Sequence, residues 1–314
     1  MHLTPHRLVA AAAAIVIGSS ALVAASAASA ATSRAHRQSY TVGAATTAGT
    51  AKQIRTLVAA STKITKLSQA QLSALPGLAT QSADLKFHLP IDCSTVSSCV
   101  FGDKASSKVI VLYGDSHARM WMPAIIPAVT LAHERLVVIG RLACPVIDYN
   151  WGTLKYANCN AERASALAAI ASLHPHSVIV SNWTGLISPR LTSAQWQAAM
   201  QATLAQISGK RVVLGDVTQL ATSPQPCLAA YPTSVQKCAS PNPDAAYPGQ
   251  QVAEQAAAKA AGALYIDPSA WLCTTSKCSA VIGTFLPYWD SNHVTVKYSA
   301  FLAGVMRTAL TPML

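Results

Sequence analysis

The sequence is short of charge and lacks the patterns that mark nucleic-acid-binding proteins. Only 11% of its 314 residues are charged, and the net charge is +11. It contains no lysine-rich run and no interleaving of basic with aromatic residues, so no nucleic-acid partner is expected. The positive net charge has two other interpretations. It keeps the chain soluble, or it draws an exported protein into peripheral contact with anionic envelope polymers and lipid headgroups.

The sequence also lacks the spacings of a structural metal site. None of its eight cysteines falls in a C-x-x-C pair, and no matching pair of histidines accompanies them. We therefore expect no metal and no organic cofactor. There is no internal repeat, and after the N-terminus no apolar run approaches the length of a membrane span.

The eight cysteines are even in number, which in an exported chain indicates disulfides, because export leads to an oxidising compartment. They fall into four pairs of sequence neighbours, and each pair is predicted to close a local loop. Many other connectivities are open to eight cysteines, so the grouping is a prediction to be tested. The predicted pairs are Cys93–Cys99, Cys144–Cys159, Cys227–Cys238 and Cys273–Cys278.

Residues 1–30 have the pattern of a secretory signal peptide. Arg7 precedes an apolar-to-small stretch from residue 8 to about residue 23, and Ala28-Ser29-Ala30 forms a small-x-small cleavage site. The alternative is an uncleaved anchor, because the apolar-to-small stretch runs on to Ala31 and is then long enough to span a bilayer. Alanine and serine dominate its second half, which favours cleavage. We expect a protein that is secreted or held in the extracytoplasmic cell envelope.

Residues 31–90 are predicted to form a linker and a helical N-terminal segment. The first part is rich in alanine, threonine, serine and glycine without an apolar period, which is typical of a flexible linker. Apolar residues at helical spacing predict one helix over residues 53–75, which Pro76 and Gly77 would end. Residues 91–314 are then predicted to form a single domain.

Short apolar runs alternate with helical stretches from residue 108 onward. This alternation predicts an α/β fold, with a parallel sheet covered by helices on both faces. In such sheets ligands bind outside the carboxyl ends of the strands, so residues that follow the runs are candidates for a site. The runs are residues 109–112, 136–139, 177–180, 211–214 and 263–266, and the residues that follow them are Ser116, Gly140, Asn182, Asp216 and Asp267.

Ser116 has the setting of a nucleophile, because it lies where a buried strand gives way to a helix. Gly114-Asp115-Ser116 is also an ordinary turn with a favoured helix cap. The C-terminal stretch distinguishes the two interpretations. Asp290 and His293 lie three residues apart there, and a histidine near neutrality can take a serine's proton while a carboxylate orients it.

Four neighbouring side chains stay open at this level. His117 follows the serine and either contacts substrate or simply starts the helix. The other three, Trp121, Trp183 and Trp289, either line a sugar-binding cleft or pack in the core, and core packing is the default for any one tryptophan.

Gly114-Asp115-Ser116-His117 after a strand, with Asp290-x-x-His293 near the C-terminus, resembles the SGNH (GDSL-like) hydrolases. The likeness is closest to the SGNH domains fused to bacterial type-3 membrane O-acyltransferases. It covers roughly residues 90–314 and is specific at the two ends. The motifs that carry it are Val111-Leu-Tyr-Gly-Asp-Ser-His-Ala118 with Trp121 and Pro123, Cys144-Pro145, Tyr265-Ile-Asp-Pro268, Leu272-Cys273 and Tyr288-Trp-Asp-Ser-Asn-His293.

The resemblance implies a flavodoxin-like three-layer sandwich with a central parallel sheet. It also implies roles for the strand-end residues: Ser116 as nucleophile, His293 as base and acid, and Asp290 as the orienting carboxylate. The oxyanion hole would use the Ser116 N–H with Gly140 and Asn182. These last two positions depart from the family's usual context, since Asn182 lies in Ser-Asn-Trp rather than in Gly-x-Asn-Asp.

The function implied is that of a secreted serine esterase or O-acyltransferase. It would act through an acyl-enzyme on acyl esters, above all acetyl esters, of envelope glycans or related molecules. The partner would be an acylated glycan or small ester, with a membrane acyltransferase or a soluble compound as acyl donor. The alternative is a non-catalytic glycan-binding module that keeps the fold. The intact serine, aspartate and histidine favour the enzyme, whereas the context of Asn182 leaves the module open.

We expect export with cleavage after Ala30, because a positive residue, an apolar stretch and a small-x-small site occur in that order. N-terminal sequencing of the protein recovered from the medium or the cell envelope should begin at Ala31. A product that retains Met1 and stays embedded in the membrane would instead establish the anchor.

Overall fold

Ser116 lies at the end of the strand around which the sheet is built. This strand, β3 (Val109–Gly114), is buried along its whole length. It pairs in parallel with β4 (Arg135–Arg141) on one edge and with β5 (Ser177–Ser181) on the other. A strand with neighbours on both edges and helices on both faces needs apolar residues throughout, which explains the unbroken run Val109–Leu112.

The sheet has the strand order predicted for the fold. Its parallel strands follow the order β4-β3-β5-β6-β8, with β6 at Lys210–Leu214 and β8 at Leu264–Ile266. By position along the chain this is the 2-1-3-4-5 order of flavodoxin-like sheets, so the predicted α/β class is confirmed. Two short strands, β1 (Asp92–Cys93) and β2 (Val100–Gly102), add antiparallel to the outer edge of β4. β4 is added on one side of β3, and the chain then crosses over to add β5 on the other side. Ligand sites of such sheets form at this switch point.

The computed structural model describes residues 48–80, 92–93, 99–150, 158–185, 190–241 and 249–314. The chain divides into two units, residues 1–39 and 40–314, and every described residue belongs to the second. The predicted signal peptide and most of the predicted linker therefore lie outside the described residues.

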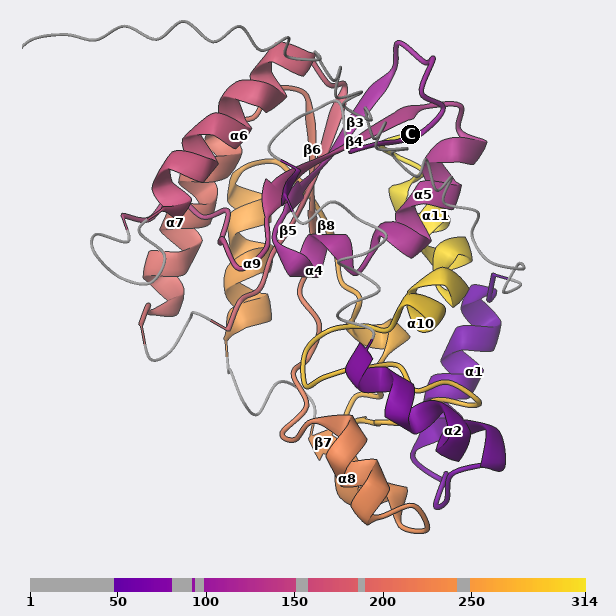
Figure 1. Ribbon diagram of the computed structural model, residues 1–314. Helices are drawn as coiled ribbons and strands as arrows, with labels where there is room; N and C mark the ends of the chain where they lie inside the picture. The colour runs from indigo at the N-terminus through magenta and orange to yellow at the C-terminus, as the bar shows by residue number, and fades with distance from the viewer. Residues whose placement is uncertain (1–47, 81–91, 94–98, 151–157, 186–189, 242–248) are drawn as a thin grey trace, which may run out of the picture. The chain divides into compact units, whose positions relative to one another are not determined.

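Helices cover both faces of the sheet (Figure 1). Side chains alternate along β3, so Val111 and Tyr113 join one core cluster while Ile110 and Leu112 join the other. The first cluster includes residues of α6 (Cys159–Leu173), α7 (Ser193–Ala205) and α9 (Gln250–Ala260). The second includes residues of α5 (Met122–Leu131), α10 (Val296–Phe301) and α11 (Ala303–Leu310).

The N-terminal segment differs from the single helix predicted over residues 53–75. It forms α1 (Ala51–Ser61), then α2 (Gln69–Ala74) and a 3-10 turn at Leu75–Thr80. The break has a local cause. Ser68 and Gln71 form a reciprocal capping box, in which each side chain accepts the other residue's backbone N–H, so a new helix begins there. Apolar residues of the segment still join the second core cluster, among them Ile54, Val58 and Leu75.

The stretch after Ser116 is also divided. The helix predicted to follow the strand at Ser116 is formed as two pieces, α4 (Ser116–Arg119) and then α5, with Trp121 between them. Pro123 lies in the first turn of α5, where its missing N–H has no partner to lose. The division lets the short α4 hold Ser116 at the strand end while α5 packs against the sheet.

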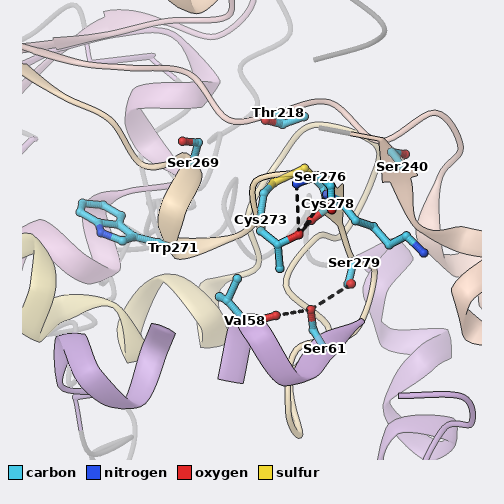
Figure 2. The surroundings of a disulfide bond; sticks show 12 residues. Val58, Ser61, Thr218, Ser240, Ser269, Trp271, Cys273, Ser276, Cys278 and Ser279 are labelled. Carbon is cyan, nitrogen blue, oxygen red and sulfur yellow. Dashed lines mark hydrogen bonds between the residues drawn. A yellow bond between two sulfur atoms is a disulfide. The ribbon is translucent and has the colours of Figure 1, made fainter. Parts of the chain in front are cut away.

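Three of the four predicted cysteine pairs lie at disulfide distance, with sulfur–sulfur distances of 2.03 Å for Cys144–Cys159, 2.00 Å for Cys227–Cys238 and 2.15 Å for Cys273–Cys278. Cys99 is also disulfide-bonded, and the side chain of its predicted partner Cys93 lies outside the described residues. Figure 2 shows Cys273–Cys278 above α1, where Ser61 donates to the Val58 carbonyl and bonds the Ser279 hydroxyl at 3.0 Å. The C-terminal loops are thus joined to the N-terminal helix.

We expect the fold to require glycine at position 114, because there is no room for a side chain there. A Cβ at this position would overlap the Ser181 carbonyl oxygen of the neighbouring strand and crowd the Ala118 side chain. Gly114→Ala should therefore lower the free energy of unfolding by about 1–3 kcal/mol, the usual cost of overpacking. Urea denaturation measures this. Gly77→Ala is the control, since a Cβ at Gly77 meets no atom within 4 Å, and an equal loss in both variants would contradict the close contact.

Candidate active site

Asp115 holds the turn that presents Ser116. It is the N-cap of α4, and its Oδ1 accepts the His117 N–H at 2.8 Å. Its Oδ2 accepts the Trp183 N–H at 3.0 Å, from the segment that follows β5. Because one carboxylate bonds both segments, the start of α4 is fixed against the end of the neighbouring strand. Ser116 stays half-buried while Asp115 and His117 are buried.

Ser116, His293 and Asp290 form one continuous hydrogen-bonded chain. His293 Nε2 lies 2.8 Å from Ser116 Oγ, although the two residues are 177 positions apart. His293 Nδ1 lies 2.8 Å from Asp290 Oδ2. An ionised carboxylate only accepts hydrogen bonds, so Nδ1 carries a proton and the Nε2 lone pair faces the serine hydroxyl. This arrangement suits transfer of the serine proton to the histidine.

Asp290 is held in its ionised form by its surroundings. Burial tends to raise the pKa of this carboxyl, but the hydrogen bond and charge of His293 oppose it. The backbone N–H groups of Asn292 and His293 also donate to Asp290 Oδ1, at 2.9 and 2.7 Å. Together these interactions hold the pKa of Asp290 below its usual value. The loop therefore supplies both an oriented imidazole and the charge that orients it.

An indole ring packs on the face of the proposed base. Trp289 stacks on His293, with ring centroids 4.7 Å apart and an interplanar angle of 24°. Trp183 lies farther away, with its ring 6.4 Å from that of His117. Trp121, by contrast, is fully buried and packs edge-on against Trp271. Trp183 and Trp289 are thus at the site, and Trp121 belongs to the core.

The two remaining residues predicted for an oxyanion hole lie at the ends of the strands that flank β3. Gly140 has a φ of +124°, and a Cβ there would overlap the Gly114 carbonyl. Asn182 follows Ser181, which pairs with Gly114, and its side chain is fully buried. Both its amide atoms lack a hydrogen-bond partner among the described residues. A buried amide without a partner is costly to the fold.

A family comparison decides what kind of domain this is. The model of the SGNH domain that is fused to AT3 domains matches residues 83–308. The chain belongs to this SGNH family. A solved structure, the periplasmic domain of the lipopolysaccharide acetyltransferase from Salmonella ser. Paratyphi A, has the same fold with a TM-score of 0.57. The two are 13% identical, and the likeness covers 78% of this chain and 96% of the other. A comparison with curated proteins gives no match.

The SGNH domain contains no group of three histidine, cysteine or acidic side chains placed to hold a metal, as far as the described residues extend. Within the same residues no helix is both long and apolar enough to cross a bilayer.

Beside the serine lies a second group of titratable side chains that sequence reasoning did not assemble. Asp216 Oδ1 lies 2.5 Å from His117 Nδ1, and the Asp216 N–H donates to Glu254 Oε2 at 2.9 Å. Asp216 was recognisable as a strand-end residue. Glu254 gave no signal, because it is one acid within an alanine-rich helix, yet it is fully buried. Asp267, the other strand-end acid, caps its own turn by accepting the Ser269 N–H.

Glu254 is expected to lower the stability of the SGNH domain near neutral pH. Burial, followed by repulsion from Asp216, raises the pKa of Glu254 well above its ordinary value. In the unfolded chain this glutamate has a pKa of about 4.3, so it loses its proton at a lower pH than it does in the folded protein. The wild type therefore loses stability as the pH rises from about 4 towards neutrality. Glu254→Gln should remove this loss, and its advantage over wild type should grow across that range.

Urea denaturation at several pH values tests the Glu254 prediction. Glu162→Gln is the control for loss of one negative charge, since Glu162 pairs with Arg141 near the surface. A difference between Glu254→Gln and wild type that does not change with pH would contradict the assignment.

Proposed function

We propose that this SGNH domain is an extracytoplasmic serine esterase or O-acyltransferase that acts on acetyl or other short acyl esters of envelope glycans or related molecules. The observation that carries the proposal is the hydrogen-bonded chain Ser116–His293–Asp290. The family supports acyl chemistry, and the disulfides fit an oxidising compartment. The similar Salmonella domain is part of a lipopolysaccharide acetyltransferase, which makes an acetylated glycan the first substrate class to test.

The reaction would proceed through an acyl-enzyme. His293 Nε2 takes the proton of Ser116 as its Oγ attacks the acyl carbon, and the carbonyl oxygen becomes an oxyanion. The Ser116 N–H, the Gly140 region and the Asn182 amide are the proposed donors to that oxyanion. His293 then gives the proton to the leaving alcohol, and Asp290 stabilises the imidazolium in between. Water or a sugar hydroxyl, deprotonated by His293, attacks the acyl group and frees the serine.

The acceptor decides between hydrolysis and transfer. We propose a membrane acyltransferase as acyl donor in the transfer reaction, on the grounds that the family is described by its fusion to AT3 domains. Incubating the protein with an acyl ester, with and without an unacylated oligosaccharide, separates the two outcomes, because transfer yields an acylated sugar and hydrolysis yields the free acid.

Ser116→Ala and His293→Ala should each reduce kcat for short acyl esters and acetylated oligosaccharides by about a thousandfold or more. The double variant should lose little beyond either single variant, because members of one catalytic unit are strongly non-additive. Asp290→Asn should cost less, since part of the histidine's position survives. A serine-reactive phosphonate should label Ser116 in wild type and should label it far more slowly in His293→Ala.

Ser223→Ala is the matched control, because the Ser223 hydroxyl at the start of α8 (Pro224–Ala230) makes no capping hydrogen bond. This variant should retain full activity. Full ester hydrolysis by Ser116→Ala, or labelling of another serine, would refute the assignment. Binding of acetylated oligosaccharides without turnover would then favour the non-catalytic glycan-binding module.

A further inference from the structure

A second histidine–carboxylate pair lies directly beside the proposed base. His117 and Asp216 are joined by a hydrogen bond of 2.5 Å, and their side chains are 1% and 5% exposed. The ring centroids of His117 and His293 are 4.5 Å apart, with an interplanar angle of 51°. His293 is thus in contact with Trp289 and with His117. The proposed acyl transfer does not use the second pair, so its presence in the core of the site needs another explanation.

The Asp216 carboxylate is fixed by four donors. Its Oδ1 accepts from His117 Nδ1 and from the Val217 N–H at 2.8 Å. Its Oδ2 accepts from the N–H and the hydroxyl of Thr184, at 2.8 and 2.9 Å. Three of these four donors are neutral groups, so His117 is the one that can bring a positive charge next to the buried carboxylate.

The other groups that face His117 are mostly acidic. Asp115 lies at the start of its own helix, and Asp290 lies in the C-terminal loop beside His293. Glu254 of α9 accepts a hydrogen bond from the backbone N–H of Asp216. Burial disfavours the charged form of His117, but the carboxylates of Asp216, Asp115 and Asp290 outweigh it, and the pKa of His117 lies above its ordinary value.

We propose that His117 is a positively charged positioning residue, whose imidazolium is held by Asp216 and opposes the uptake of a second positive charge by the neighbouring His293. Two imidazolium ions in ring contact repel each other, so His117 disfavours uptake of a proton from solvent by His293. The charge of His117 affects the catalytic step less than it affects the uptake of a proton from solvent by His293. The serine proton that reaches His293 leaves a negative oxyanion behind, and such a pair of opposite charges interacts weakly with a third charge.

The proposal rests on the proposed function for its kinetic test. His117→Asn and His117→Gln remove the charge and keep a polar amide that can donate to Asp216. In both variants the midpoint of the fall in kcat/KM at acid pH should move to a higher pH, by about one pH unit or more. The value of kcat/KM at alkaline pH should fall less than its value at acid pH. A purely structural His117 would lower activity at every pH and leave that midpoint unchanged, and that result would overturn the proposal.

The chain supplies a matched control far from the serine. His176 Nε2 lies 2.9 Å from the buried carboxylate of Glu134, and these two residues precede β5 and β4 at the opposite ends of the strands. His176→Asn therefore breaks a comparable pair without touching the site. Its fall in kcat/KM at acid pH should coincide with that of wild type. A shift equal to that of His117→Asn would show that loss of any such pair suffices, and would contradict the proposal.

A second measurement does not depend on catalysis. Imidazole nitrogen NMR of the wild-type protein should show both ring nitrogens of His117 still protonated at a pH above the ordinary histidine pKa. The titration midpoint of His293 should rise in His117→Gln. A neutral His117 ring, or an unmoved His293 midpoint, overturns the inference even if the protein is an esterase. Activity that survives Ser116→Ala would instead overturn the proposed function and leave the NMR result standing.

Discussion

The close contact of three strand ends positions the residues that follow these strands in the candidate site. At Gly114, Gly140 and Ser181 the backbones of β3, β4 and β5 approach so closely that a Cβ on either glycine would overlap a neighbouring carbonyl. Parallel strands bring their carboxyl ends to the same edge of a sheet, and here that edge has no room for side chains between the strands. Ser116 and Asn182 lie two residues and one residue beyond this contact, and Ser116 is half-buried while Asn182 is fully buried.

The site concentrates acidic groups where water is scarce, so its charges must be balanced locally. Asp290 is balanced by His293 and by two backbone N–H groups. Burial raises the pKa of Asp115, and the charge of His117 and the N–H groups of Trp183 and His117 act against this rise. Glu254, for which burial and Asp216 act in the same direction, is the acid that takes up a proton most readily. One cationic ring among these carboxylates removes repulsion that packing alone cannot remove.

Features that depend on neighbouring residues could be predicted from the sequence, whereas contacts between residues far apart in the chain could not. The strands were recognisable because each is an apolar run ended by polar residues. Asp290 and His293 were recognisable because they share one short loop, so their spacing alone suggests their contact. The interaction of His117 with Asp216 joins residues 99 positions apart, and neither residue type nor spacing indicates it. Ser68 and Gln71 also divided a helix whose apolar period continued through them, since a capping box competes with helix continuation.

The loop that carries Asp290 and His293 owes its position to the segment that begins with Asp216. The Leu220 N–H donates to the Ser291 carbonyl at 2.7 Å, and the Tyr288 hydroxyl donates to the Thr218 carbonyl at 3.3 Å. Residues 216–220 thus hold the loop of Asp290 and His293 through their backbone, while the Asp216 side chain holds His117. A shift of this segment would move His293 away from Ser116 and His117 away from His293 together. Alignment and charge in this site therefore depend on one stretch of chain at the end of β6.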